Sequence, residues 1–249
     1  MIDVTVHGAE GRMGRLVTEL IEHTEGFVLA ALVTGVGHER PVGSFHPRLP
    51  LTAQDRIAEV HPRGGVIVDF SLAPALDGLL DGAAASAAPL VVGTTGHDED
   101  QLRRLRAYAQ THAVVLSSNF SVGIPTLRLL LEKLAEVLPE GFMPAQVETH
   151  HRHKQDLPSG TARALARTWE DRRGAGAVPT SSLRIGGVTG EHTWVFSDDE
   201  ETLVLTHRAH SRRAFLRGLV PAVRYAAQAG PGLVTMEDVL GATRRGPIA

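Results

Sequence analysis

The chain has 249 residues, 43% hydrophobic and 21% charged, so it can bury a core for one large or two modest domains. Its formal net charge of −3 argues against a general nucleic-acid binder, and the absence of cysteine excludes disulfides, thiol catalysis and cysteine-ligated metals. No apolar run approaches the roughly 20 residues of a membrane span, and the N-terminus lacks a signal-peptide pattern. We therefore expect a soluble, cytoplasmic α/β protein that binds neither nucleic acid nor membrane.

The N-terminal segment has the pattern of a dinucleotide-binding turn. Residues 2–7 alternate like a strand, residues 8–14 read Gly-Ala-Glu-Gly-Arg-Met-Gly, and residues 15–23 have helical periodicity. Glycines at such a turn let the backbone approach a pyrophosphate, which rests on the helix N-terminus. The spacing departs from the usual G-x-G-x-x-G because Ala9 stands at its first glycine. We favour a nucleotide site over a purely structural turn, with the Glu10 side chain pointing to solvent.

Strands and helices alternate through the first half of the chain, which predicts a parallel sheet with helices on both faces. The expected strands lie at residues 28–33, from 51, at 66–70, 90–93 and 114–117, with helices at 74–88 and 98–112. Ligands of such sheets bind at the carboxyl ends of the strands. Small and polar residues follow four of these ends, at residues 8–11, 69–71, 93–96 and 117–121.

The pattern changes after Asn119. The expected elements are a helix at residues 124–138, a strand at 145–149, a helix opened by Ser159, strands at 183–188, 191–196 and 202–208, and a returning helix at 217–229. A meander-like sheet that follows a parallel sheet along the sequence predicts a second, α+β domain. The fold class is thus α/β, a Rossmann-like dinucleotide-binding domain of residues 1–121 and 212–249, with residues 122–211 forming a substrate-binding and oligomerisation domain.

A cationic cluster lies at the start of the second half. His150, His151, Arg152, His153 and Lys154 are consecutive, and a Ser-Gly-Thr step that opens a helix follows at residues 159–161. Cations beside a helix N-terminus favour an anion, and histidines exchange protons near neutral pH. The segment therefore predicts a site that binds a carboxylate-bearing molecule and moves a proton on it.

Three other interpretations compete with this one. His151 and His153 on one strand face are a candidate metal site, but Arg152 and Lys154 would repel a cation and no carboxylate pair completes the ligands. We therefore expect no metal. A non-catalytic, NAD(P)-binding regulator explains the glycine turn but leaves the cationic cluster without a purpose. A solvated loop would account for neither the histidines nor the helix start.

Four motifs together carry a resemblance to a known family. Residues 12–14 (Arg-Met-Gly), 93–96 (Gly-Thr-Thr-Gly), 119–123 (Asn-Phe-Ser-Val-Gly) and the block 150–161 occur in the order of the dihydrodipicolinate reductase family. These enzymes are also called 4-hydroxy-tetrahydrodipicolinate reductases, and they act in the diaminopimelate route to lysine. The likeness covers essentially the whole chain, and its most specific part is the block from His150 to Thr161.

The resemblance implies an enzyme that reduces a cyclic dicarboxylate with a hydride from NADPH or NADH, with loss of water. It assigns His150 as the acid/base residue and Lys154 as the proton donor. The implied substrate contacts are His151, Ser159, Gly160 and Thr161. The implied cofactor contacts are Gly8, Ala9, Glu10, Gly11, Arg12, Met13, Gly93, Thr94, Thr95, Ser117, Ser118, Asn119 and Phe120. The family is typically homotetrameric, which implies that the second sheet meets copies of itself.

Two positions stay open. The family commonly places an acidic residue directly after the second strand, to accept from the adenosine ribose, but residues 34–38 here carry none. Without that carboxylate, the usual repulsion of a 2′-phosphate is missing, and His38 or Arg40 would reach such a phosphate. NADPH is therefore weakly favoured, and NADH remains an alternative. Arg212 is either a further contact for a substrate carboxylate or simply solvated.

Overall fold

The computed structural model describes residues 1–174 and 176–244, and the chain separates into two compact units. The N-terminal unit comprises Met1–Phe120 and Leu216–Ala249, and the inserted unit comprises Ser121–Phe215. Residues 245–249, the end of the predicted nucleotide-binding domain, lie outside the described residues. Each unit is described by itself below.

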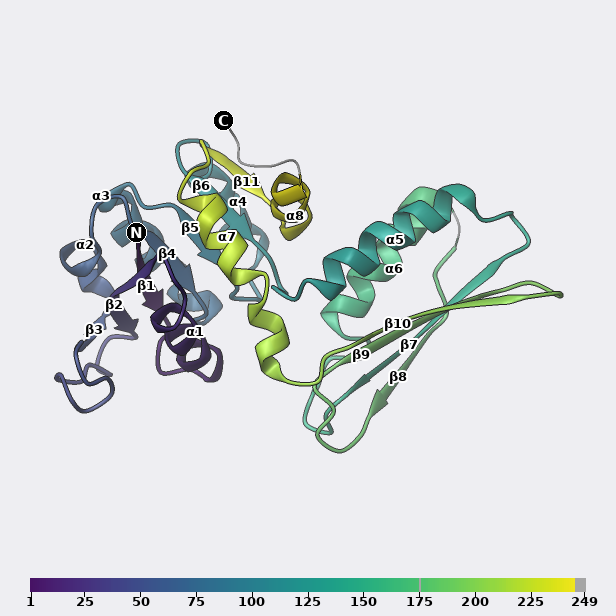
Figure 1. The fold of residues 1–249 in the computed structure, drawn as a ribbon, viewed down its shortest axis with the longest axis horizontal. Helices are drawn as coiled ribbons and strands as arrows, with labels where there is room; N and C mark the ends of the chain where they lie inside the picture. Colours follow the sequence, from purple (N-terminus) through teal and green to yellow (C-terminus); the bar gives the residue numbers. More distant parts are fainter. Residues whose placement is uncertain (175, 245–249) are drawn as a thin grey trace. The chain divides into compact units, whose positions relative to one another are not determined.

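The N-terminal unit is built on a seven-stranded sheet whose pairings are all parallel, in the order β3-β2-β1-β4-β5-β6-β11 (Figure 1). Its strands are β1 (Ile2–His7), β2 (Phe27–Thr34), β3 (Leu51–Ala53), β4 (Val66–Asp69), β5 (Leu90–Val92), β6 (Ala113–Leu116) and β11 (Gly232–Val234). The direction of winding reverses between β1 and β4, which is where Rossmann-like sheets bind their ligands. The predicted parallel α/β fold is confirmed.

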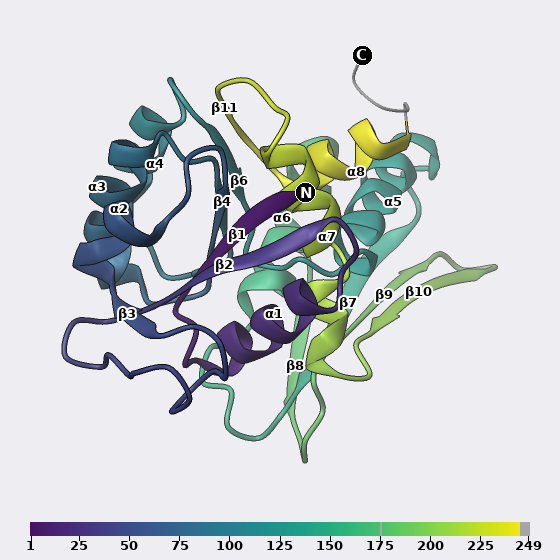
Figure 2. The same ribbon diagram turned by 60° about the vertical axis from the view of Figure 1, so that its left-hand side comes forward.

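Helices cover both faces of this sheet (Figure 2). One core contains side chains of α1 (Arg12–Glu22), α7 (Leu219–Ala226) and α8 (Met236–Arg244), and the other those of α2 (Ile57–Val60), α3 (Leu76–Ser86) and α4 (Glu99–Tyr108). Strand β4 between these cores is buried along its whole length, as expected for a strand covered on both faces. In the described part of the chain, no helix combines the length and hydrophobicity needed to cross a bilayer.

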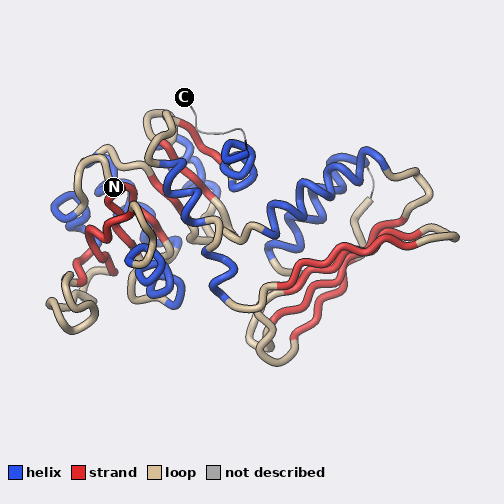
Figure 3. Tube along the Cα trace, viewed as in Figure 1, coloured by secondary structure: helices blue, strands red, loops and turns tan. Residues whose placement is uncertain are grey.

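The inserted unit contains a four-stranded sheet in the order β10-β9-β7-β8, with α5 (Gly123–Val137) and α6 (Gly160–Arg173) on one face (Figure 3). Its strands are β7 (Met143–His150), β8 (Thr180–Arg184), β9 (Glu191–Ser197) and β10 (Thr202–Arg208). Trp169 of α6 packs on Trp194 and Phe196 of β9, with ring centroids 6.4 and 4.8 Å away. These aromatic rings are almost completely buried and fix the helices to the sheet.

The other face of this sheet, here named the open face, carries no helix of the inserted unit's described part (Figure 3). Strand β9 alternates strictly between buried and half-buried side chains, so Thr193 and Val195 lie on the open face. Their cross-strand partners Val147, Val204 and Thr206 extend it over β7 and β10. The centre of this face is therefore uncharged and largely apolar.

The predicted meander is wrong for β8, which pairs with β7 at the sheet edge and not with β9, the next strand along the chain. Strands β7 and β8 run parallel, because the 14 residues of α6 carry the chain back along the sheet before β8 begins. The strand expected at residues 183–188 instead spans Thr180–Arg184, because Gly186 turns the chain with a φ of +52°. Helix α1 also begins earlier than predicted, at Arg12, with Gly11 as its N-cap.

Candidate active site

The glycine turn between β1 and α1 is closed by glycines at positions 8, 11 and 14. Gly8 has a φ of +77°, which favours glycine, and its carbonyl accepts from the Gly11 N–H at 3.0 Å. A Cβ on Gly14 would lie 2.1 Å from the Gly8 oxygen, so the helix packs against the turn only without a side chain there. The tight turn therefore begins at Gly8, and Ala9 is buried beneath it.

The N-terminus of α1 is suited to a pyrophosphate. Its N-cap residue is Gly11, which has no side chain to bond to the helix N–H groups. Among the described residues, the first turn of α1 contains no acidic side chain. The first N–H groups of a helix lack intrahelical partners and favour an anion. A dinucleotide thus fits the turn formed by Gly8, Gly11 and Gly14, and the predicted contacts of Arg12 and Met13 would lie in the first helical turn.

Phe70, which the sequence placed within one of the four strand-end segments without a role of its own, lies between the predicted cofactor loops. Its ring would touch a Cβ on Gly93 at 2.4 Å, its backbone would touch one on Gly8 at 2.7 Å, and its ring centroid is 5.7 Å from that of Phe120. The loops after β1, β5 and β6 therefore meet at one edge of the sheet, as predicted. Phe120 is buried, so a cofactor could meet only its backbone.

The loop after β6 is held by its own side chain. The Ser117 hydroxyl donates to the Asn119 carbonyl at 2.9 Å and accepts from the Asn119 N–H at 3.2 Å. Two strands away, Asp69 at the end of β4 is an ionised buried group. Burial would raise the pKa of Asp69, but His7, Ser71 and Thr94 lower it below its ordinary value. Thr94 lies near this carboxylate, and its assignment to the cofactor stays a prediction, as do those of Thr95 and Ser118.

The expected orientation of Glu10 is wrong. Its side chain is 29% exposed and turns to the end of β2, where its Oε2 accepts a hydrogen bond from the Thr34 hydroxyl at 2.7 Å. His38 Nδ1 lies 3.9 Å from the same oxygen. Glu10 turns away from solvent because the Thr34 hydroxyl donates the hydrogen bond that water would otherwise supply to the carboxylate.

The cationic cluster follows strand β7, whose last residue, His150, is buried. His150 Nδ1 donates a short hydrogen bond to Oε2 of Glu148, two residues earlier on the same face of β7. An ionised carboxylate only accepts, so neutral His150 carries its proton on Nδ1 and leaves Nε2 free to take a proton. Glu148 therefore leaves Nε2 as the nitrogen available for the acid/base role predicted for His150.

Glu148 itself is fully buried and is neutralised by Arg184 of β8. The guanidinium binds both carboxylate oxygens, at 2.7 and 2.9 Å, and Oε1 also accepts from the Ser159 N–H at 3.2 Å. Burial would raise the pKa of Glu148, but bonds from Arg184, Ser182 and His150 lower it to about 2. Sequence reasoning missed both Glu148 and Arg184, although Glu148 occupies a buried position in a strand that leads into the cluster.

The pKa of His150 is also lowered from its ordinary value. Burial is the main cause, and the charges of Lys154 and Arg184 lower it further against the opposing effect of Glu148. Next to it, burial and the positive charge of His150 lower the pKa of His192 to about 3. Both imidazoles are therefore neutral at pH 7. Gly190 leaves space at the reactive nitrogen, since a Cβ there would lie 3.1 Å from His150 Nε2.

Lys154 is paired with Asp156, a third residue that sequence reasoning missed. Lys154 Nζ lies 2.7 Å from Asp156 Oδ1, while Asp156 Oδ2 accepts from the Gly160 N–H at 3.1 Å. Ser159 caps α6 by accepting from the Ala162 N–H at 3.1 Å. The predicted cation and one predicted backbone donor thus already converge on a single carboxylate, which shows that they can bind one together.

The remaining candidates are placed as follows. His151 is half-buried, and its ring centroid lies 6.3 Å from that of His153. Thr161 follows Gly160 in the first turn of α6. Arg212 is exposed at the start of a 3-10 turn, Arg212–Leu216, and its role stays a prediction. Within residues 1–174 and 176–244, no three His, Asp or Glu side chains are grouped to hold a metal ion.

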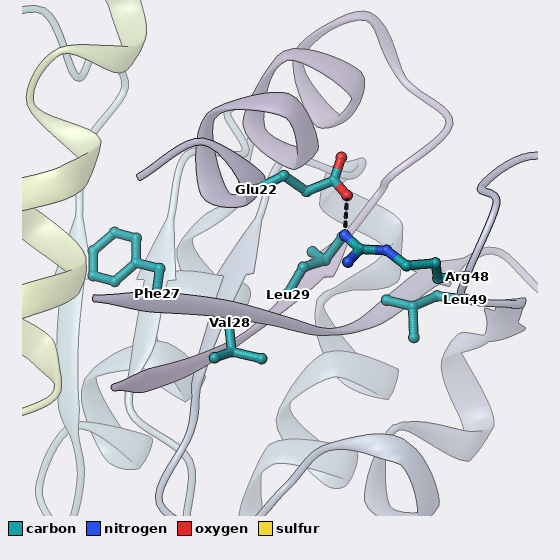
Figure 4. A pocket seen from close by; sticks show the side chains of 6 residues that line it. All are labelled: Glu22, Phe27, Val28, Leu29, Arg48 and Leu49. Atoms are coloured by element: carbon teal, nitrogen blue, oxygen red, sulfur yellow. Dashed lines mark hydrogen bonds and ion pairs between the residues drawn. The ribbon is translucent and has the colours of Figure 1, made fainter. Parts of the chain in front are cut away.

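A pocket of about 370 Å³ lies elsewhere in the N-terminal unit. It is lined by Glu22, Phe27, Val28, Leu29, Arg48 and Leu49 (Figure 4). Phe27 begins β2, so this pocket lies at the opposite end of that strand from Thr34 and the glycine turn. Its two charged groups, Glu22 and Arg48, form an ion pair at 2.7 Å. It contains none of the predicted site residues.

Models of one family match both parts of the chain. The N-terminal model of dihydrodipicolinate reductase matches residues 2–120, and the C-terminal model matches residues 123–240. A protein named 4-hydroxy-tetrahydrodipicolinate reductase from Akkermansia muciniphila is 37% identical, over 97% of this chain and 98% of its own. One of the same name from Rubrobacter xylanophilus is also 37% identical, over 98% and 100%.

A solved structure shares the fold. Dipicolinate-bound dihydrodipicolinate reductase from Paenisporosarcina sp. TG-14 aligns with a TM-score of 0.77 at 20% identity, over 96% of this chain and 99% of that chain. A myo-inositol dehydrogenase from Corynebacterium glutamicum aligns at 0.64 with 11% identity, which shows that the architecture extends to other dehydrogenases. With both family models matched and relatives above 30% identity over nearly the whole chain, this protein belongs to the dihydrodipicolinate reductase family.

Proposed function

We propose that this chain reduces 4-hydroxy-tetrahydrodipicolinate to tetrahydrodipicolinate in the diaminopimelate route to lysine. The balanced reaction consumes one NAD(P)H and one proton, and it releases NAD(P)⁺ and water. The curated relatives bear the name of this activity over nearly their whole length. The observation that carries the proposal is the convergence of Lys154 Nζ and the Gly160 N–H on one carboxylate, with Lys154 near enough to His150 to lower its pKa.

The dicarboxylate substrate would bind at the N-terminus of α6. Asp156 occupies the position of an anion there, and a substrate carboxylate would replace it on Lys154 and on the Gly160 and Thr161 N–H groups. His151 and Ser159 would complete the site. The name of the Paenisporosarcina protein records bound dipicolinate, a dicarboxylate of the same class.

Proton movement would belong to His150 and Lys154. Loss of water takes a proton from a ring carbon and gives one to the leaving hydroxyl, and reduction then needs one further proton beside the carbon that receives the hydride. Lys154 carries an ammonium that can donate, and His150 Nε2 can take up and return a proton while Glu148 holds Nδ1. Both groups stand on one loop that Arg184 fixes through the carbonyl of Lys154 at 3.3 Å.

A nicotinamide cofactor, NADPH or NADH, would supply the hydride. The N-terminal unit would hold it through the N–H groups that follow Gly11, with the loops at residues 93–95 and 117–120 along the same sheet edge. The glycines support this assignment, because a Cβ at position 8 or 14 would fill the turn. A non-catalytic, NAD(P)-binding regulator remains the second candidate function. It accounts for the N-terminal unit but not for the cationic cluster of the inserted unit.

We further propose a cytoplasmic homotetramer assembled through the open face of the inserted unit. An antiparallel sheet usually presents polar side chains on the face that its own helices leave uncovered. Here Val195, Val204 and Val147 occupy the centre of that face, and Val204 is 52% exposed. A surface of this kind favours contact with a second copy.

Lys154→Ala tests the proposed chemistry. It should keep nicotinamide binding but lower kcat by about a hundredfold or more, the usual contribution of a positioned proton donor. The control is Lys133→Ala, the only other lysine of the chain, which pairs with Glu136 on the surface of α5. Equal rates in the two variants would remove Lys154 from the mechanism.

A further inference from the structure

We infer that Glu10, within the glycine turn, selects the cofactor and makes NADH the preferred hydride donor. The inference rests on the proposed function, because it assumes that a nicotinamide dinucleotide binds at this turn. It reverses the weak preference for NADPH that the sequence alone suggests. The lack of an acidic residue directly after β2 does not mean that this position lacks a carboxylate.

The position of the Glu10 carboxylate is fixed at the end of β2. The N–H groups of Gly8 and Ala9 both donate to the carbonyl of Val33, at 2.9 and 3.1 Å, so the turn is joined to the last residues of the strand. The Thr34 hydroxyl then donates to Glu10 Oε2 at 2.7 Å. Backbone and side-chain bonds thus hold the carboxylate beside the strand end.

This is the place where a Rossmann-like unit meets the adenosine ribose. In such units an acidic side chain at the end of the second strand accepts from the ribose hydroxyls, whereas a 2′-phosphate needs cations there. Glu10 offers its second oxygen, Oε1, for the first purpose. The same carboxylate would repel a 2′-phosphate, because both groups are negatively charged. The Thr34 hydroxyl already donates its proton to Glu10, so it is not available to the phosphate.

The cations expected to receive a 2′-phosphate are directed elsewhere. Arg40 Nη1 donates to the carbonyls of His38 and Glu39, at 3.3 and 3.0 Å. His38 Nδ1 is 3.9 Å from Glu10 Oε2, so the carboxylate would offset the positive charge of a protonated His38 and weaken its attraction for a phosphate. Arg15 donates to the Glu10 carbonyl at 3.1 Å and stacks over the Phe45 ring.

Glu39 provides a matched control in the same region. It lies in the loop after β2 and is exposed, and its Oε1 accepts from the Gly37 N–H at 3.2 Å. Glu39→Gln removes the same charge as Glu10→Gln. A difference between the two variants therefore reports the position of Glu10, not the net charge of the unit.

The test measures dissociation constants of NADH and NADPH by nicotinamide fluorescence, for the wild type, Glu10→Gln and Glu39→Gln. We expect the wild type to bind NADH about tenfold more tightly, the usual value of one charged hydrogen bond. Glu10→Gln should bring the two constants together, and Glu39→Gln should change their ratio less than about twofold. Glu10→Lys should make NADPH the tighter ligand.

Tighter binding of NADPH by the wild type, or an unchanged ratio in Glu10→Gln, would overturn the inference. The proposed function would stand in that case, provided that substrate-dependent oxidation of either nucleotide is observed. Failure of both nucleotides to bind would instead overturn the proposed function, and the inference with it.

Discussion

Two carboxylates control the charges around the proposed catalytic residues. Glu148 is buried, bonded to both His150 and Arg184, and it decides which imidazole nitrogen holds the proton. Asp156 lies on the surface side of the same loop and bonds to Lys154 and to the helix N-terminus. The first carboxylate acts through His150 and is a positioning group. The second would compete with the proposed substrate for Lys154 and the Gly160 N–H.

Glu148→Gln should lower kcat by about a hundredfold, because an amide has only one acceptor oxygen and cannot accept from His150 and from the Ser159 and Arg184 donors together. Glu148 opposes the lowering of the His150 pKa, so its removal should lower that pKa further. The acid limb of the pH profile of kcat/KM, which falls as His150 becomes protonated, should therefore move to lower pH. Steady-state kinetics against pH and an NMR titration of His150 would measure both effects.

Glu191→Gln is the control for that variant. Glu191 begins β9 and pairs with Arg208 at 2.6 Å, so it loses the same charge without touching His150. If the acid limb stays at its wild-type pH in Glu148→Gln while the rate falls, Glu148 has only a structural role.

Asp156→Asn should lower the KM for the dicarboxylate substrate by about two- to fivefold. The neutral amide no longer competes for Lys154, and a partly exposed ion pair is worth only a modest free energy. Initial rates at varied substrate concentration would show this. A raised KM would mean that Asp156 holds the loop in its binding shape instead of occupying the substrate's place.

Much of the site was predictable at the residue level because its chemistry is concentrated in one segment. His150, Lys154 and Ser159 stand out as a histidine, a lysine and a helix cap within one ten-residue segment. Glu148, Arg184 and Asp156 do not, since a carboxylate in a strand or an arginine far along the chain gains its meaning only from the partner that folding brings to it. The orientation of Glu10 was wrong for the same reason.

At the scale of elements, the site is a strand end joined to a helix start. Strand β7 places Glu148 and His150 on its covered face, and α6 begins after a nine-residue interval that ends in its cap, Ser159. Arg184 of β8 then binds Glu148 from the neighbouring parallel strand. The β7-α6-β8 crossover thus holds every proposed catalytic group of the inserted unit in one rigid motif.

Ser159→Ala should lower the free energy of unfolding by about 1 kcal/mol, the usual value of an N-cap. Its hydroxyl is buried and accepts from the Ala162 N–H, so its loss leaves that donor without its partner. Chemical denaturation would measure the change. Ser181→Ala, an exposed serine on β8, should change stability by less than about 0.5 kcal/mol. Equal effects would contradict the capping role.

The apolar periodicity located most of the elements, but the partners of the strands were harder to predict. Buried runs such as β4 and β5 need no further information, because continuous hydrophobicity indicates a strand covered on both faces. Strand β8 reads Thr-Ser-Ser-Leu-Arg and has little hydrophobic pattern, so its bounds and its parallel pairing were missed. Its position is fixed by α6 and by Arg184.

At the scale of the whole molecule, the chain combines a dinucleotide-binding sheet with an inserted unit that would supply substrate chemistry and assembly. The order of motifs was enough to predict this organisation, because a glycine turn and a cationic helix start each indicate one ligand. The proposed assembly cannot be derived from motifs, since the face that would form it takes its residues from three strands of the sheet.

Val204→Glu should disrupt the proposed tetramer. A charge at the centre of the open face would have to be buried between copies, which is strongly unfavourable. Light scattering should give about four times 26.6 kDa for the wild type and a smaller mass for the variant. Val42→Glu, at an equally exposed valine in the N-terminal unit, should keep the wild-type mass. An unchanged mass in Val204→Glu would place the interface elsewhere.

The most direct test of the account is the reaction itself. Substrate would be generated in place from pyruvate and aspartate semialdehyde by the preceding synthase, and the loss of nicotinamide absorbance followed with NADH and NADPH in parallel. The account predicts oxidation that depends on substrate, with a higher kcat/KM for NADH than for NADPH. Binding of both nucleotides without any substrate-dependent oxidation would contradict it and favour the non-catalytic regulator.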